Sequence, residues 1–257
     1  MTKELIKIQG KERQSEVRLW LPKEYKNAII ITHSWRNNMD EPICSEAAQR
    51  FYKNNFLVLQ LNLVGHGKSE GTLKDLSYKT INDDITSAFN YLKQEYKPEK
   101  ISGMGISLGA AAIGFSNLKF ASQILLSYRV ILDSKRLYDR YADLIAEKES
   151  ELSKKGYIMI PSASGRGDFE MGEEWINEMR YHSDDLTKRY VANKRKTLLV
   201  QGLKDDFYDA TIFNSFLKKS GVDYFEVITG NHNFSNKDNR DMILDLCEQW
   251  LADNLSM

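Results

Sequence analysis

Ser107 lies at the centre of the pentapeptide Gly105-Ile106-Ser107-Leu108-Gly109, a G-x-S-x-G pattern that follows an apolar stretch and precedes a run of small residues. A serine between two such glycines is typical of a sharp strand-to-helix turn that exposes a nucleophilic hydroxyl. The glycines suit that turn because side chains two residues before and after the serine would collide. The same small residues would also let a helix pack closely without any chemistry, so the pentapeptide alone leaves both interpretations open.

A serine nucleophile needs a base that accepts its proton. The chain has four histidines, and two of them, His182 and His232, follow Ser107. In hydrolases with a G-x-S-x-G turn, the nucleophile comes first in the chain, then the acid, then the histidine. We predict His232 as the base, because its loop follows the last predicted strand and can reach back across the sheet. His182 is the alternative and would have to approach from an inserted segment.

A carboxylate must orient the base, and it should lie between the serine and the histidine at the end of a strand. Asp205 meets this condition, since it falls three residues after the strand that we expect to end at Gly202. Asp206 and Asp133 could take the same role. Aspartates are also common in turns and at helix starts, so a purely structural role is the competing interpretation.

Two backbone amides should stabilise the oxyanion of an acyl-transfer reaction. The first is that of Leu108, directly after the predicted nucleophile. The second usually comes from the loop after an earlier strand, here Thr32-His33-Ser34-Trp35. Either Ser34 or Trp35 could supply it, and we predict Trp35, whose indole could also line the pocket or simply pack under the inserted segment.

The elements that would position these residues alternate along the chain. A β-hairpin is predicted for the first 21 residues, with strands at Glu4–Gln9 and Glu16–Leu21. Short apolar stretches typical of strands buried on both faces follow at Ala28–Thr32, Phe56–Leu61, Ile101–Gly105, Gln123–Ser127, Thr197–Gln201 and Tyr224–Ile228. Apolar residues at helical spacing predict helices at Ser45–Asn54, Ile81–Gln94, Ala110–Leu118, Ala210–Lys219 and Asp241–Asn254. This alternation predicts an α/β fold with a mostly parallel central sheet flanked by helices.

Residues 134–190 interrupt the alternation with mixed helical patterns and a Gly/Ser-rich patch. An insertion at this point would cover the carboxyl ends of the strands, where open α/β sheets bind ligands. We therefore predict a core formed by residues 1–133 and 191–257, and a small cap formed by residues 134–190. Tyr157–Ile160, Trp175 and Met179 could shape a pocket there, although plain packing explains each of them equally well.

Composition excludes several classes of function. Lysine plus arginine and aspartate plus glutamate number 36 each, so no net charge attracts nucleic acid. No apolar stretch is long enough for a signal peptide or a membrane span. Cys44 and Cys247 show neither metal-binding nor disulfide spacing, and we expect both to be reduced structural residues of a cytoplasmic protein. We predict neither a metal nor a cofactor. The oligomeric state cannot be inferred.

Taken together, four segments resemble the α/β-hydrolase superfamily, in the branch of serine esterases and acylglycerol lipase-like enzymes that includes cinnamoyl (feruloyl) esterases. They are Thr32-His33-Ser34-Trp35; Leu63-Val64-Gly65-His66-Gly67-Lys68-Ser69; Gly105–Gly109; and Gly202-Leu203-Lys204-Asp205 together with Asn231-His232-Asn233-Phe234. The resemblance implies the same triad and oxyanion amides, and a structural role for the loop around His66. The chain departs from the pattern at Ser34, where the family often has glycine, and at Asn62, where it often has aspartate.

The predicted function is hydrolysis of a small-to-medium acyl or aromatic carboxylic ester through an acyl-enzyme. Two further functions stay open. The same triad could cleave thioesters or amides, and spacing cannot separate these substrates from esters. The fold could also serve as a non-catalytic module that binds a ligand or a partner, because a fold does not determine a function.

Overall fold

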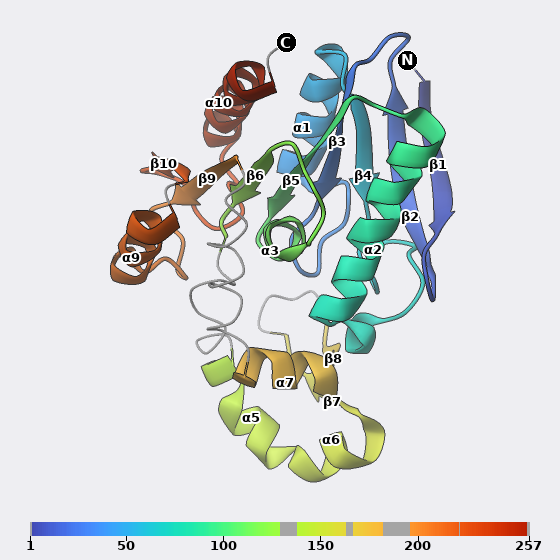
Figure 1. Cartoon of the computed structure of the whole chain (residues 1–257). Coiled ribbons are helices and arrows are strands. Elements are labelled where there is room, and N and C mark those ends of the chain that lie inside the picture. The colour runs from blue at the N-terminus through green and yellow to red at the C-terminus, as the bar shows by residue number, and fades with distance from the viewer. Residues whose placement is uncertain (1, 129–137, 163–166, 182–195, 221, 256–257) are drawn as a thin grey trace.

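The computed structural model describes residues 2–128, 138–162, 167–181, 196–220 and 222–255. Eight strands form one sheet in the order β1-β2-β4-β3-β5-β6-β9-β10 (Figure 1). These strands are β1 (Thr2–Gln9), β2 (Gln14–Leu21), β3 (Asn27–Thr32), β4 (Leu57–Leu61), β5 (Lys100–Ile106), β6 (Gln123–Leu126), β9 (Thr197–Gly202) and β10 (Asp223–Val227). β1 pairs with β2 and β2 with β4 in antiparallel fashion, whereas the other neighbours are parallel. The predicted hairpin and mostly parallel sheet are thus confirmed.

Helices cover both faces of the sheet. Within the described residues they are α1 (Pro42–Lys53), α2 (Tyr78–Tyr91), α3 (Leu108–Phe115), α5 (Ala142–Glu147), α6 (Glu149–Lys155), α7 (Glu173–Tyr181), α9 (Ala210–Ser220) and α10 (Lys237–Leu255), with a 3-10 helix at Leu73–Asp75 (η1) and a π-helical turn at Leu92–Tyr96 (η2). The predicted helix over Ile81–Gln94 therefore begins three residues earlier, where Ser77 caps α2 by accepting a hydrogen bond from the Thr80 amide.

The core consists of two apolar layers, one on each face of the sheet. β3 shows why, since all six of its residues are buried and successive side chains point to opposite faces. Ala28 and Ile30 belong to the layer under α2 and α3, whereas Ile29 and Ile31 belong to the layer under α1 and α10. The continuous apolar stretches thus form strands buried on both faces, as predicted.

The segment between β6 and β9 contains an element that the sequence pattern does not predict. Two four-residue strands, β7 (Tyr157–Ile160) and β8 (Phe169–Gly172), form a separate antiparallel hairpin beside α5, α6 and α7 (Figure 1). Strands of four residues show little alternation of apolar and polar residues. The sequence therefore predicted only mixed helical patterns for residues 134–190. The cap boundaries at residues 134 and 190 lie outside the described residues and stay a prediction.

The hairpin and α7 pack on the core through the start of α2 and η1. A Cβ atom on Gly172 would lie only 1.9 Å from the Lys74 carbonyl oxygen, so the two backbones are in direct contact there. Tyr78 of α2 packs against Trp175 with ring centroids 5.2 Å apart. The Tyr78 amide donates a 2.7 Å hydrogen bond to the Glu178 carboxylate. In the structure, Ile158, Ile160 and Met179 are buried within the same apolar layer as α2 and α3.

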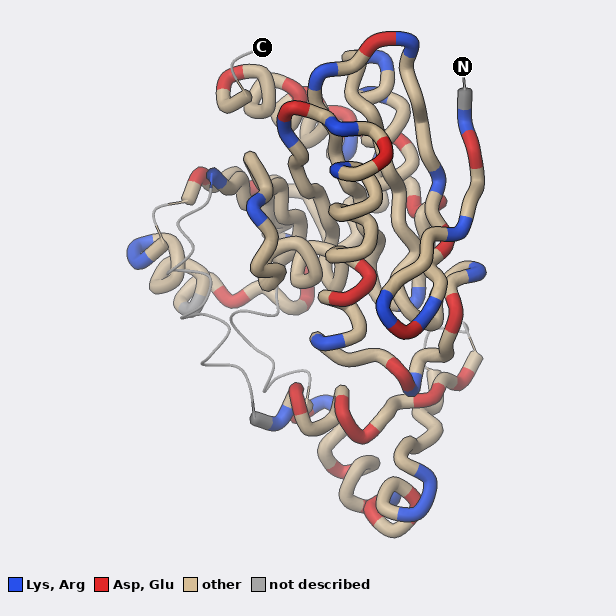
Figure 2. The backbone as a smooth tube through the Cα atoms, turned by 45° about the vertical axis from the view of Figure 1, so that its right-hand side comes forward, with Lys and Arg blue, Asp and Glu red and all other residues tan. Residues whose placement is uncertain are grey.

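Charges are distributed evenly over the described chain, with acidic and basic residues interspersed along it (Figure 2). Cys44 and Cys247 are buried and unpaired, as expected. Across the residues described, every helix is too short or too polar to cross a membrane.

Candidate active site

Ser107 lies at the end of β5 in a backbone conformation that L-residues rarely adopt, with φ 54° and ψ −110°. A left-handed conformation at a serine costs on the order of 1–3 kcal/mol and persists only where its surroundings enforce it. Here the surroundings are backbone: a Cβ atom on Gly105 would lie 2.3 Å from the Gly109 carbonyl, and one on Gly109 would lie 2.4 Å from the Thr32 carbonyl oxygen. The two glycines thus permit the sharp turn, as predicted.

Three side chains form a continuous hydrogen-bonded line across the carboxyl ends of β5, β9 and β10. His232 Nε2 lies 2.9 Å from Ser107 Oγ. On the other side of the ring, His232 Nδ1 lies 2.7 Å from Asp205 Oδ2. Because a carboxylate only accepts, Nδ1 carries the proton and Nε2 is free to accept the serine hydroxyl proton. The structure brings together the three residues that were predicted to act together.

Asp205 is buried and fully hydrogen-bonded. Its Oδ2 also accepts from Gln201 Nε2 at 3.0 Å, and its Oδ1 accepts from the Phe207 amide at 2.9 Å. Burial alone would raise the pKa of Asp205, but the hydrogen bonds and positive character of His232, with the Phe207 amide and Gln201, outweigh it and lower that pKa. The carboxylate therefore stays ionised.

The competing candidates for acid and base are placed differently. Asp206, next to the triad acid, is exposed to solvent. Asp133 and His182 lie outside the described residues. The described part of the chain thus offers Asp205 as the buried carboxylate bonded to the His232 ring.

The loop that carries His232 is held from two sides. Ser127, at the end of β6, donates its hydroxyl to the His232 carbonyl oxygen at 2.7 Å. Phe207 packs its ring against the imidazole, with centroids 5.4 Å apart. Sequence reasoning missed both contacts; no pattern pointed to Ser127, although it lies at a strand end beside the site.

The β3–α1 loop, residues 33–41, lies next to the Ser107 turn because Thr32 Oγ1 donates to the Gly109 carbonyl at 3.0 Å. The Ser34 amide is occupied, since it donates a 2.8 Å hydrogen bond to Glu41 Oε2. Among the described residues no acceptor contacts the Trp35 amide or that of Leu108, the first residue of α3. Each of the two amides predicted for the oxyanion thus lacks a protein acceptor in the described part of the chain.

His33 and His66 brace this loop as neutral rings. His33 donates Nδ1–H to the Ser34 carbonyl and accepts the Leu63 amide on Nε2. His66 donates Nδ1–H to the Val64 carbonyl and accepts the Arg36 amide on Nε2. Burial lowers the pKa of His33 to about 3, and burial likewise lowers the pKa of His66. Both rings have their nitrogens engaged with backbone, which matches the structural role that the resemblance implies for His66.

Arg36 connects the β3–α1 loop to the β7–β8 hairpin. Its guanidinium donates to Ser162 Oγ at 3.0 Å and to the Gly167 carbonyl at 2.6 Å. It also lies 4.4 Å above the Phe169 ring, and Trp35 packs edge-on against that ring at 5.2 Å. The inserted segment is thus attached to the same loop that presents the Trp35 amide.

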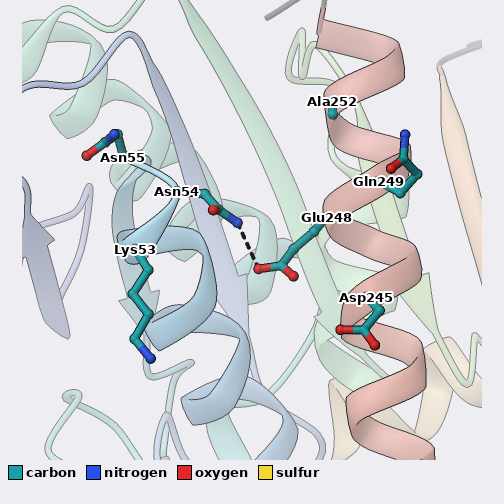
Figure 3. Close-up of a pocket in the computed structure, with 7 residues that line it drawn as sticks. All are labelled: Lys53, Asn54, Asn55, Asp245, Glu248, Gln249 and Ala252. Carbon is teal, nitrogen blue, oxygen red and sulfur yellow. Dashed lines mark hydrogen bonds between the residues drawn. The ribbon is translucent and has the colours of Figure 1, made fainter.

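A separate hollow of about 540 Å³ lies between the end of α1 and α10 (Figure 3). It is lined by Lys53, Asn54, Asn55, Asp245, Glu248, Gln249 and Ala252. A helix that follows a parallel strand runs back toward the strand's amino end, so the end of α1 lies away from Ser107.

Within the described residues, no group of three or more His, Cys, Asp or Glu side chains is placed to hold a metal ion.

Comparison with known proteins identifies the fold of the chain. No protein-family model matches the chain, and no curated protein matches its sequence. Among solved structures, Est1E from Butyrivibrio proteoclasticus with ferulic acid bound superposes with a TM-score of 0.75 at 15% identity, covering 98% of this chain and 100% of that one. An esterase from Pyrococcus furiosus gives 0.74 at 15% identity, covering 99% and 91%. Alpha/beta hydrolase domain-containing protein 10 from mouse gives 0.72 at 18% identity, covering 98% and 99%. The predicted α/β-hydrolase fold is confirmed.

Proposed function

We propose that the protein is a serine hydrolase that cleaves carboxylic esters through an acyl-enzyme. The observation that carries this proposal is the hydrogen-bonded line from Ser107 Oγ through the His232 ring to Asp205. A serine is nearly inert at neutral pH unless a base removes its proton, and a buried ionised carboxylate keeps that base in the required tautomer. The line supplies the nucleophile, the base and the carboxylate in one place.

The reaction begins when Ser107 Oγ attacks the ester carbonyl carbon while His232 Nε2 takes the hydroxyl proton. The ring then carries a positive charge, which the Asp205 carboxylate stabilises from Nδ1. Collapse of the tetrahedral intermediate breaks the bond to the alcohol, and His232 returns its proton to that leaving group. Water attacks the acyl-serine in the second half, again deprotonated by His232, and releases the acid.

The Trp35 and Leu108 amides are the donors that we assign to the oxyanion. Trp35 follows Thr32 by three residues and Leu108 directly precedes Gly109, and a hydrogen bond joins Thr32 to Gly109. Neither amide has a competing acceptor among the described residues. Loss of one such donor typically costs about 10²–10³ in rate. The strained backbone of Ser107 supports the same assignment, because the turn makes Leu108 the first residue of α3, where an amide has no acceptor within the helix.

The substrate that we propose is a small-to-medium acyl or aromatic ester. Trp35, Phe169 and Phe207 place aromatic rings around the loops that carry the site. The fold neighbour Est1E binds ferulic acid, an aromatic acid, which supports the same substrate class.

The test is hydrolysis of p-nitrophenyl acetate, butyrate and octanoate by wild type, Ser107→Ala, Asp205→Asn and Asp206→Asn. We expect turnover by wild type, a loss of about 10⁴-fold or more for Ser107→Ala, and about 10⁴-fold in kcat for Asp205→Asn, because the wrong histidine tautomer is then favoured. Asp206→Asn is the matched control and should stay within about twofold, since its side chain is exposed.

Two results would contradict the serine mechanism, and a third would contradict the ester substrate. Equal rates for wild type and Ser107→Ala would remove Ser107 from the chemistry. No turnover, together with no labelling of Ser107 by a fluorophosphonate, would favour a non-catalytic binding module instead. Rapid cleavage of the matching thioester without cleavage of the ester would keep the triad and change the substrate.

A further inference from the structure

A buried carboxylate that the triad does not use lies at the start of α1. Glu41 is only 5% exposed, and both of its oxygens accept hydrogen bonds from the β3–α1 loop. Oε2 accepts the Ser34 amide at 2.8 Å. Oε1 accepts the Ser34 hydroxyl at 2.7 Å and Asn37 Nδ2 at 2.8 Å. One side chain thus binds the backbone and the side chain of Ser34 at once.

Keeping this carboxylate buried is costly without partners. Burial raises the pKa of Glu41 above its ordinary value, and the hydrogen bonds from Ser34 and Asn37 and the positive character of His232 offset only part of that rise. A charged acceptor with two oxygens fixes its donors more strongly than a neutral group does. Glu41 therefore holds Ser34 by its amide and its hydroxyl, while the His33 ring and the Asn37 amide hold the Ser34 carbonyl.

The consequence reaches the adjacent amide. Because Ser34 donates its N–H to Glu41, it is the Trp35 N–H of the next peptide that has no acceptor among the described residues at this end of the loop. The backbone of Ser34 does not require glycine, since the left-handed residue of the loop is Arg36, with φ 59°. The serine that departs from the family pattern thus has a use, because its hydroxyl provides the second bond to Glu41.

We propose that Glu41 is a positioning residue that holds the Trp35 N–H in place to stabilise the oxyanion. This proposal rests on the ester hydrolysis proposed above. Glu41 would act through Ser34 and would touch neither substrate nor reacting atoms.

The test compares Glu41→Ala and Glu41→Gln with Asp40→Asn. Alanine removes every bond to the loop, and a misplaced donor costs on the order of 10²-fold, so kcat should fall about 10²-fold while KM changes less than about threefold. Glutamine keeps one oxygen that can accept the Ser34 amide, so it should restore kcat to within about tenfold of wild type. Asp40→Asn removes the same charge one residue earlier. Asp40 is exposed and pairs with Arg18, so kcat should stay within about twofold.

The variant Ser34→Ala/Glu41→Ala tests the route of the effect. If Glu41 acts through Ser34, the double variant should lose no more kcat than Glu41→Ala alone, because residues that act as one unit are not additive. The proposal is overturned if the losses of kcat in the two single variants add up in the double variant. It is also overturned if both Glu41→Gln and Glu41→Ala keep the wild-type kcat, or if Glu41→Ala raises KM at constant kcat. If Glu41→Ala does not fold, the test rests on Glu41→Gln and Ser34→Ala. An unchanged kcat in both variants overturns the proposal, and a lower kcat in both supports it.

Failure of the proposed function gives a different result. In that case wild type and Ser107→Ala hydrolyse p-nitrophenyl esters equally, and the role of Glu41 falls with it. An active wild type that depends on Ser107 but tolerates loss of Glu41 overturns the positioning role alone.

Discussion

The Ser107 turn and the β3–α1 loop lie at the ends of two paired strands, β5 and β3, but different forces hold them. The turn at residues 105–109 is fixed by backbone packing, because Gly105 and Gly109 leave no space for a side chain. The β3–α1 loop is fixed by polar side chains: Glu41, His33 and His66 bind its backbone. Steric constraints do not change with pH or charge, whereas hydrogen-bonding constraints do. Variants and conditions that affect one mechanism should therefore leave the other intact.

The largest effect is expected where the two regions touch. Gly109→Ala would place a Cβ atom 2.4 Å from the Thr32 carbonyl oxygen and force both backbones apart. We expect a loss of about 3 kcal/mol in the free energy of unfolding and about 10²-fold in kcat/KM, measured by urea unfolding and ester hydrolysis.

Gly156→Ala is the control for that experiment. Gly156 has φ 74° with nothing within 4 Å of a Cβ atom, so alanine should cost about 1 kcal/mol from backbone strain alone and leave kcat/KM unchanged. Equal activity losses in the two variants would show that the contact with Thr32 is not what matters.

Acid should weaken the polar loop and spare the turn. The pKa of His33 is about 3 in the folded state and about 6.5 in the unfolded state. The unfolded chain therefore binds more protons between these values, and the stabilisation present above about pH 6.5 is lost as the pH falls toward 3. The free energy of unfolding should decrease by up to about 1.4 kcal/mol per pH unit from this ring.

Urea unfolding of wild type and His33→Gln at pH 7, 6 and 5 measures this slope. His33→Gln should show a shallower decrease, whereas Gly156→Ala should keep the wild-type slope because nothing lies within 4 Å of a Cβ atom at that position. A wild-type slope in His33→Gln would assign the acid sensitivity to other groups.

The smallest effect concerns the strain in the turn. Ser107→Gly should be about 1 kcal/mol more stable than Ser107→Ala, because glycine adopts φ 54° without the steric penalty of a Cβ atom. The larger entropy that glycine loses on folding offsets only part of this gain. Thermal unfolding of the two inactive variants gives the comparison. Equal stabilities would show that the turn stores no strain at this residue.

The contrast also explains what could be predicted from sequence. The turn follows from Gly105, Ser107 and Gly109, because the whole pattern lies within five consecutive residues. The strands followed from apolar stretches, and chain order selected His232 and Asp205. Ser127 was not predicted, since folding brings it to His232 from a distant part of the chain. Glu41 was not predicted, because no sequence pattern marks a carboxylate that binds the backbone of its own loop. The β7–β8 hairpin was not predicted either, because four-residue strands hardly differ from loop in their pattern.

Arg36 has a consequence for exchanging parts between proteins of this fold. Its backbone amide binds His66 in the core, whereas its guanidinium binds Ser162 and Gly167 beside the β7–β8 hairpin. The inserted segment is therefore not an independent module that can be transplanted at its two ends. A chimera with a different hairpin would leave the Arg36 guanidinium without these two acceptors. The residue at position 36 therefore has to be chosen together with the new hairpin.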